Sequence, residues 1–268
     1  LERAGVSLAA YAAGAAEDDL KKARTSMHQA HGALAIVGLD GITEFADAIE
    51  QLLATLGEDA TQDVGAAIAA AQGGFAALRG YLDDLMAGHP NQPLRLFLPY
   101  RAMVVARGLP APGPAELFFP DLTQRPPKRE KEPSPLTPEA LAARLKAARL
   151  GFERGLLKWI KNDPKGIAEM KVSVAMIEMT RATPAARAYW WVALGVLDAL
   201  AANGLADLPE AKRFAMRLGA QIKKLIDGKA AADETLLREA LYQAACATSG
   251  GEALAIVRAA YRLDGMVP

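Results

Sequence analysis

The sequence contains one cysteine, Cys246, and a single cysteine cannot form an intramolecular disulfide. A chain without such crosslinks is typical of a reducing compartment. Basic and acidic residues balance at 31 each, so no net field attracts nucleic acid or an anionic membrane surface. No apolar run reaches the ~18–20 residues needed to span a bilayer, and no signal peptide is visible. We therefore expect a cytoplasmic chain with no nucleic-acid partner and no membrane insertion.

Aromatic residues and strand-like patterns are also scarce. Aromatics make up 6% of the chain although apolar residues reach 51%, and alanine is the most frequent residue. Small and straight-chain residues pack well between helices. Alternation of apolar and polar residues is nearly absent, and its best candidate, residues 94–100, is short. The composition and the dominant helical periodicity predict an all-α protein.

Glycine and proline divide the helical pattern into two groups. We predict two helical bundles, at residues 1–108 and 137–268. The chain opens on Leu1 inside a predicted helix, without an initiator Met, so we expect a piece of a longer protein. The predicted helices are 1–13, 17–37, 40–56, 60–87 and 93–107 in the first bundle, and 138–161, 164–181, 184–202, 208–227, 233–247 and 250–262 in the second.

The segment between the bundles, residues 109–136, holds eight prolines and cannot be helical for long. It is predicted to be a linker. Its stretch "ELFFPDL" carries two phenylalanines and is expected to lie against a domain surface. Its charged stretch "RPPKREKEPSP" is expected to be the hinge.

Two of the three histidines stand three residues apart in the helix predicted at 17–37. At ~100° per residue, His28 projects roughly 140° from the centre of the apolar seam and His31 about 80°. We therefore expect His28 to face water and His31 to lie near the edge of the core. The seam consists of Leu20, Ala23, Met27, Ala30, Leu34 and Val37.

The histidines raise three alternatives: a metal site, a phosphate-carrying histidine, or accident. A metal needs three or four converging ligands. His28 and His31 supply two, the third histidine is the distant His89, and no carboxylate lies within a helical turn of the pair. We therefore predict no metal site and no cofactor. Nucleophilic catalysis would need an orienting acid and an oxyanion site, and neither is visible nearby.

A phospho-accepting histidine needs only an exposed imidazole on a rigid helix, nearby positive charge and a bare surface for a partner. His28 is the candidate acceptor. Arg24 and His31 are expected to stabilise the phosphate, because both lie within a turn of it. Gly32 removes side-chain bulk one turn after His28. Together with Gln29 and Lys21, this glycine forms the predicted docking surface.

The segment "HQAHGALAIVG", residues 28–38, resembles the motif of histidine phosphotransfer (HPt) domains. That motif is His, two residues, Lys or Arg, Gly, and a second Gly six residues further on. His28 falls on the phosphorylated histidine, and Gly32 and Gly38 fall on the glycines. His31 departs from the motif, because the family has Lys or Arg there. The resemblance implies a four-helix bundle, transfer through His28, and a response-regulator receiver domain as partner.

A wider resemblance covers almost the whole chain. "HQAHGALAIVGLDGITEFADAIEQLL", "ELFFPDL", "YWWVALGVLDALAANGL" and "LGAQIKKLID" occur here in the order seen in the N-terminal region of ChpA/PilL-type hybrid chemotaxis histidine kinases and in its stand-alone relative FimL. These proteins control type IV pili and twitching motility. The resemblance implies a signalling role in that system, near the pilus machinery at the cell pole. It also implies a kinase core in the parent protein. This chain has no kinase-type glycine box, so it is predicted not to be an enzyme.

The helix predicted at 184–202 can be aligned with the histidine helix by matching Gly195 to Gly32. Trp191 then falls where His28 stands, which suggests a second HPt-like bundle without an acceptor. Tyr189, Trp190 and Trp191 form the largest aromatic cluster. They are interpreted as core, with an exposed aromatic anchor for a partner as the alternative.

Two functions from different classes stay open at this point. The first is a phosphorelay module in which His28 exchanges a phosphoryl group with a receiver domain or the parent's kinase core. The second is a non-phosphorylated interaction or scaffold module that keeps the HPt fold, with self-association among its interactions. The missing basic residue at position 31 favours the second, and a solvent-facing His28 beside positive charge favours the first.

Overall fold

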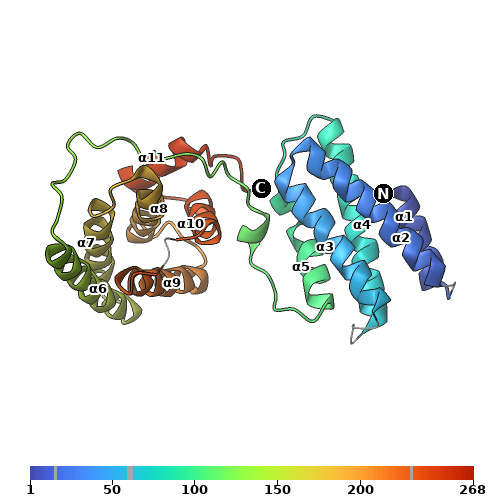
Figure 1. The fold of residues 1–268 in the computed structure, drawn as a ribbon, viewed down its shortest axis with the longest axis horizontal. Helices are drawn as coiled ribbons and strands as arrows, with labels where there is room; N and C mark the ends of the chain where they lie inside the picture. Colours follow the sequence, from blue (N-terminus) through green and yellow to red (C-terminus); the bar gives the residue numbers. More distant parts are fainter. Residues whose placement is uncertain (15–16, 59–62, 230–231) are drawn as a thin grey trace. The chain divides into compact units, whose positions relative to one another are not determined.

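The computed structural model describes residues 1–14, 17–58, 63–229 and 232–268. All regular elements in these ranges are helices: eleven α-helices and two short 3-10 helices (Figure 1). The prediction of an all-α protein is therefore confirmed. The chain forms two compact units, Leu1–Phe119 and Pro120–Val267, and each is described by itself.

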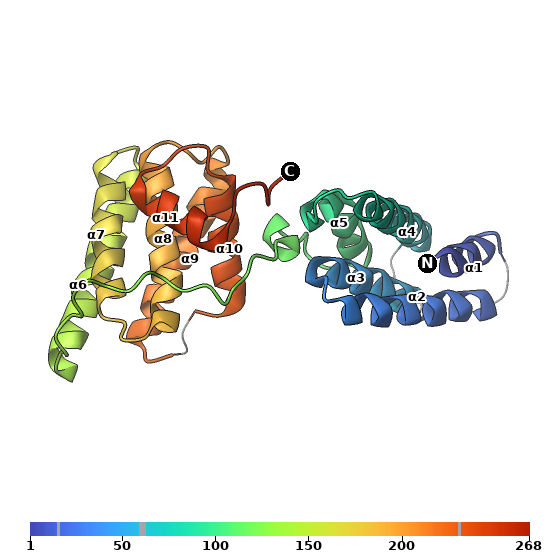
Figure 2. The ribbon, with the colours of Figure 1, turned by 90° about the horizontal axis from the view of Figure 1, so that it is seen from above.

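The first unit is a four-helix bundle with a fifth helix added. Helix α2 contacts α1 and α3, α4 contacts α3, and α1 closes the ring against α4. Helix α5 packs on α3 and α4 from outside, so the predicted HPt-like bundle corresponds to α1–α4 (Figure 2). The bounds are α1 Glu2–Ala12, α2 Glu17–Val37, α3 Asp40–Gly57, α4 Val64–Met86, the 3-10 helix η1 Pro93–Leu96, α5 Phe97–Ala106 and the 3-10 helix η2 Pro114–Leu117.

Helix α3 supplies more of the core of this unit than any other described element, because its apolar residues recur at helical spacing on one broad face. Helix α2 buries its seam only in its first half, where Leu20, Ala23 and Met27 are buried. Val37, predicted to continue that seam, is 66% exposed. A straight helix drifts by about 20° per heptad from a 3.5-residue repeat, so a regular seam rotates out of the core over its length. The end of α2 therefore has an apolar surface.

Helix α8 is the centre of the second unit, because it contacts α7, α10 and α11 and buries residues on all sides. Tyr189, Trp190 and Trp191 are all at least nine-tenths buried. The interpretation of this cluster as core is confirmed, and the alternative of an exposed anchor is wrong. The bounds are α6 Pro138–Ile160, α7 Lys165–Met179, α8 Pro184–Ala201, α9 Leu208–Ile226, α10 Glu234–Cys246 and α11 Glu252–Tyr261.

The residues predicted to form the linker are divided between the two units. In the first unit Leu117 and Phe118 are almost fully buried, so the prediction that "ELFFPDL" lies against a domain surface is confirmed. In the second unit the guanidinium of Arg129 donates to Glu178, with Nη2 3.1 Å from Oε2, and Arg187 Nε donates to the same carboxylate over 2.5 Å. These three side chains are about nine-tenths buried. The charged stretch is therefore fixed at Arg129, where a hinge was expected.

Helix boundaries agree with the predictions to within a few residues. The largest differences come where caps decide the boundary: Asp63 accepts from the N–H of Ala66, so α4 begins at Val64 and not at residue 60. Residues 60–62 lie outside the described part. Residues 94–100, the best strand candidate, form η1 and the first turn of α5.

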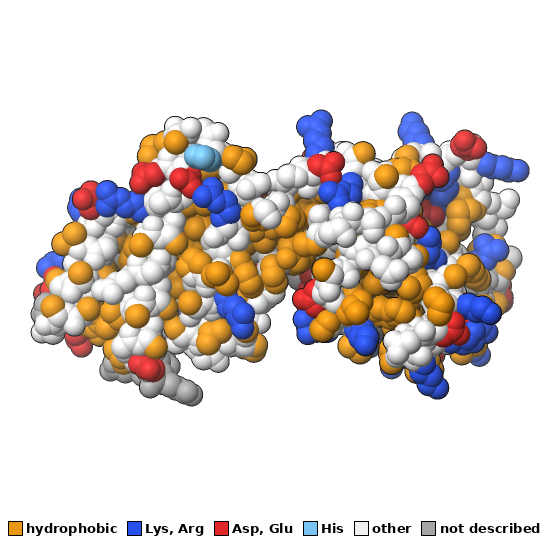
Figure 3. Space-filling view, turned by 180° about the vertical axis from the view of Figure 1, so that it is seen from behind, with side chains coloured by type: hydrophobic (Ala, Val, Ile, Leu, Met, Phe, Trp, Pro, Cys, Tyr) orange, Lys and Arg blue, Asp and Glu red, His pale blue; other side chains and the backbone are white. Residues whose placement is uncertain are grey.

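Apolar side chains also reach the surface of both units (Figure 3). Among them are Leu98 on α5, Met86 on α4 and Leu157 on α6, each at least 60% exposed. Within the described helices, none is both long and apolar enough to cross a membrane.

Helices α6 and α7 approach so closely that their backbones touch. A Cβ atom added at Gly155 would lie 2.7 Å from the carbonyl oxygen of Gly166 and 2.9 Å from the backbone nitrogen of Met170. No real Cβ makes such contacts, so the two helices can pack only with glycine at this position.

We expect Gly155→Ala to lower the free energy of unfolding by about 1–3 kcal/mol, because α6 and α7 must separate. Gly80→Ala is the matched control. Gly80 lies inside α4 with nothing within 4 Å of an added Cβ. Its substitution is expected to stabilise by about 0.5–1 kcal/mol through helix propensity. Urea unfolding followed by circular dichroism measures both, and equal midpoints for the two variants would contradict the contact.

Candidate functional site

Helices α2 and α3 form an antiparallel hairpin that positions both histidines. Three acidic residues in the first turn of α2 favour its N-terminus through the helix dipole. Gly38 ends the helix with φ +76°, a backbone conformation that glycine adopts without strain. Helix α3 then starts at Asp40 and runs back along α2. Residues equally far from this turn therefore lie side by side.

Glu50 on α3 binds both histidines at once. Its Oε1 lies 2.7 Å from Nδ1 of His28, and its Oε2 lies 2.8 Å from Nδ1 of His31. The side chain of His28 is 77% exposed, that of His31 23% and that of Glu50 28%. The predictions that His28 faces water and that His31 lies at the core boundary are confirmed.

The Glu50 carboxyl is held in its ionised form. Partial burial alone would raise its pKa, but the hydrogen bonds from His31 and His28 outweigh burial and lower the pKa below 4.5. A carboxylate accepts and cannot donate, so each Nδ1 carries the proton that it shares with Glu50. The other nitrogen of a neutral imidazole, Nε2, then keeps its lone pair. On His28 this nitrogen belongs to an exposed side chain.

No orienting acid was predicted near the histidines, and this prediction is wrong, because Glu50 binds them from the facing helix. The hairpin supplies the signal that could have found it. Two residues, Gly38 and Leu39, lie between the helices; residues 28 and 50 are each eleven positions from Leu39, and residues 31 and 47 are each eight positions from it. Carboxylates stand at both partner positions, Glu50 and Asp47.

The other predicted site residues lie on α2 but do not all converge on His28. An added Cβ at Gly57 would lie 3.0 Å from Nη1 of Arg24, so this guanidinium rests against the end of α3. Gly57 is seven residues beyond Glu50, about 10 Å along the helix. The structure therefore does not bring the charge of Arg24 to the His28 imidazole. Lys21, one turn before Arg24, is exposed.

The surface beside His28 is open and apolar. An added Cβ at Gly32 would meet nothing within 4 Å, and Gln29 is exposed. Ile36, one turn after Gly32, is 89% exposed. His28, Gly32 and Ile36 thus form a stripe along α2 at four-residue spacing. We call these three residues the α2 stripe. Ile36 was not among the predicted site residues, because it lies outside the apolar seam predicted for this helix.

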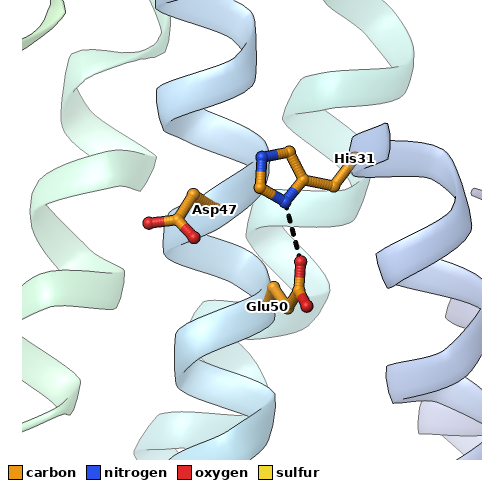
Figure 4. Close-up of side chains that lie close together, drawn as sticks. All are labelled: His31, Asp47 and Glu50. Carbon is orange, nitrogen blue, oxygen red and sulfur yellow. Dashed lines mark hydrogen bonds and ion pairs between the residues drawn. The ribbon is translucent and has the colours of Figure 1, made fainter. Parts of the chain in front are cut away.

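A second carboxylate, that of Asp47, lies close to His31 and Glu50. His31, Asp47 and Glu50 each offer one ligand atom, and these atoms lie within 4.8 Å of one another. Figure 4 shows His31 projecting from α2 toward α3, where Asp47 and Glu50 project from successive turns. Gln51 donates to Oδ2 of Asp47. The prediction of no metal site rested on the absence of such carboxylates.

Comparison with protein families gives two matches. Residues 1–88 match the family model described as "Hpt domain", and residues 137–268 match the one described as "FimL scaffold protein second domain". The chain is FimL-like and contains an Hpt domain. The first match ends just after α4, so it covers the four-helix ring, and the second begins at the cap of α6. Comparisons with curated proteins and with solved structures gave no match.

The Hpt domain is a histidine phosphotransfer module without a kinase catalytic domain, and such domains work with receiver domains and kinases. The FimL-like second domain lacks the chemistry for this transfer, because no histidine occurs after His89. Its α8 does not present the surface that α2 does. Trp191 is 9% exposed, and an added Cβ at Gly195 would lie 3.1 Å from Cγ2 of Val257 on α11. Helix α11 thus covers the face of α8 that corresponds to the α2 stripe.

We expect Glu50→Gln to lower the free energy of unfolding at pH 7 by about 1 kcal/mol, because one charged acceptor serves two donors. The pKa of Glu50 is lower in the folded chain than its usual 4.5. Its contribution is therefore present above that value and lost as the pH falls through the folded pKa.

Urea unfolding of the wild type and the variant at pH 7, 5 and 3.5 measures this contribution. The difference between them should shrink below pH 4.5. Glu130→Gln, which removes an exposed carboxylate elsewhere, is the control. A difference that stays constant down to pH 3.5 would show that Glu50 acts through packing and not through its charge.

Proposed function

We propose that this chain is a phosphorelay module of a chemosensory system that controls type IV pili and twitching motility, with His28 as the phospho-acceptor. The observation that carries the proposal is the exposed imidazole of His28 in an Hpt domain, with Nδ1 held by Glu50. The FimL-like second domain and the resemblance to ChpA/PilL-type kinases support the pilus system and a place near the cell pole.

In the proposed step the Nε2 lone pair of His28 attacks the phosphorus of an aspartyl phosphate on a receiver domain. A P–N bond forms, the P–O bond to the aspartate breaks, and the aspartate leaves as a carboxylate. Nδ1 keeps its proton throughout, so the ring becomes positively charged. The Glu50 carboxylate, 2.7 Å from Nδ1, stabilises that charge. The same geometry serves the reverse transfer and transfer from the kinase core of a parent protein.

The phosphate brings negative charge to a surface with cations on one side. Arg24 and Lys21 precede His28 by one and two turns, and both are exposed. We propose that Arg24 swings from Gly57 toward the phosphate when a partner docks, with His31 as the second stabilising group. Gly32, Gln29 and Lys21 are the proposed docking residues, and Ile36 extends this surface along the α2 stripe.

A non-phosphorylated scaffold is the second candidate, because residues 137–268 match a domain of a protein described as a scaffold. His31 in place of Lys or Arg also favours it. In that case the α2 stripe would bind the same kind of partner without any transfer. Self-association of the chain belongs to this candidate.

Phosphotransfer from a phosphorylated cognate receiver or kinase core separates the two candidates. We expect an acid-labile, base-stable phosphate on the wild type and none on His28→Gln, because the attacking nitrogen is removed. His89→Gln removes the third histidine, which is exposed beyond α4, and should be labelled like the wild type. If the folded wild type takes no label from an active donor, the phosphorelay proposal is wrong and the scaffold candidate remains.

Ile36→Glu should lower the rate of phosphotransfer per unit of donor at least tenfold by placing a charge in the docking surface, a cost of about 1.4 kcal/mol or more. Leu98→Glu, at a side chain 74% exposed on α5, makes the same change away from α2. It should transfer at the wild-type rate. Stopped-flow or quenched-flow experiments at sub-saturating donor measure the transfer rates of both variants. Equal losses of rate in Ile36→Glu and Leu98→Glu would contradict a docking surface on the α2 stripe.

A further inference from the structure

Helices α2 and α3 each present a pair of metal-binding side chains to the other, three residues apart. His28 and His31 are the pair on α2, and Asp47 and Glu50 are the pair on α3. Pairs at this spacing project from one face of a helix on successive turns. Bundles commonly build metal sites from such pairs on facing helices.

We propose that His31, Asp47 and Glu50 form a binding site for a divalent transition-metal ion of the zinc type. Their ligand atoms lie within 4.8 Å of one another, and all three residues are half-buried (Figure 4). In a tetrahedral zinc site with bonds of ~2.0–2.2 Å, ligand atoms are roughly 3.3 Å apart. Side-chain rotations that move the ligand atoms by about an ångström therefore bring them to the spacing that an ion requires.

The ligand types favour zinc over the other common divalent ions. One imidazole nitrogen and two carboxylate oxygens match a three-ligand zinc site with water in the fourth position. Magnesium and calcium prefer an all-oxygen shell, which an imidazole does not offer. The two carboxylates also give the cluster negative charge, which complements the cation. Gln51, which donates to Oδ2 of Asp47, would hold that carboxylate in place.

Metal binding would break one of the two hydrogen bonds of Glu50. An ion held by Glu50 and His31 replaces the contact of 2.8 Å between them. The positive charge of the ion also offsets the negative charge of this carboxylate, whose Oε1 accepts from Nδ1 of His28. Zinc would then slow transfer at His28, a consequence that rests on the proposed phosphotransfer. The site itself does not depend on that function.

Binding of Zn²⁺ to the full chain, by calorimetry and by competition with a chromogenic chelator, tests the site. We expect one ion per chain with a dissociation constant on the order of 1 μM. His31→Asn, Asp47→Asn and Glu50→Gln should each weaken binding at least about tenfold. His89→Asn and Glu130→Gln are matched controls and should bind like the wild type, while His28→Asn should stay within about tenfold of it.

Co²⁺ as a spectroscopic probe reports the coordination directly, since a tetrahedral site gives strong visible absorption. Circular dichroism of each variant confirms that it is folded. The site is refuted if Zn²⁺ binds no tighter than about 1 mM, or if binding survives His31→Asn and Glu50→Gln. Zinc binding is measured without any phosphate donor, so the two proposals can fail separately. A chain that does not accept phosphate can still bind zinc, and a chain that does not bind zinc can still accept phosphate.

Discussion

The single carboxylate of Glu50 accepts hydrogen bonds from two imidazoles, and the chemistry proposed for the first unit depends on this sharing. It fixes the proton of His28 on Nδ1 and so leaves Nε2 with the free lone pair that the proposed transfer requires. It also ties α2 to α3 just beyond Met27, after which α2 has no buried residue. Because one carboxylate oxygen cannot accept from His31 and bind a metal ion at once, the proposed metal site would compete with one of these two hydrogen bonds.

Most of the fold follows from local patterns, while the site depends on how two helices are placed side by side. Helical periodicity, caps and breakers are properties of neighbouring residues, so the helices were predicted nearly to their ends. The exposure of His28 also followed, since it depends only on its angle around one helix. Glu50 was missed because it lies on another helix, and its contact depends on the register of the hairpin about Leu39.

The two units use similar helices for opposite purposes. Helix α2 leaves glycine and apolar residues uncovered on one face, with Ile36 89% exposed. Helix α8 buries its aromatic residues, and α11 covers its Gly195. The two aligned glycines thus serve different physical purposes. Gly32 leaves the surface of α2 open, and Gly195 allows α11 to pack closely on α8. An alignment of residue types alone cannot distinguish these cases, because the difference lies in whether another helix covers the face.

The buried charges around Glu178 have a practical consequence for dividing the chain. The family match to the second domain begins at residue 137, but the compact unit begins at Pro120 and includes Arg129. A fragment that starts at the family boundary would keep Glu178 and Arg187 and lose the Arg129 guanidinium that pairs with Glu178. Water would then enter beside a buried carboxylate that has lost one of its two cations. The shortest natural second domain therefore starts within the proline-rich stretch, well before the first helix.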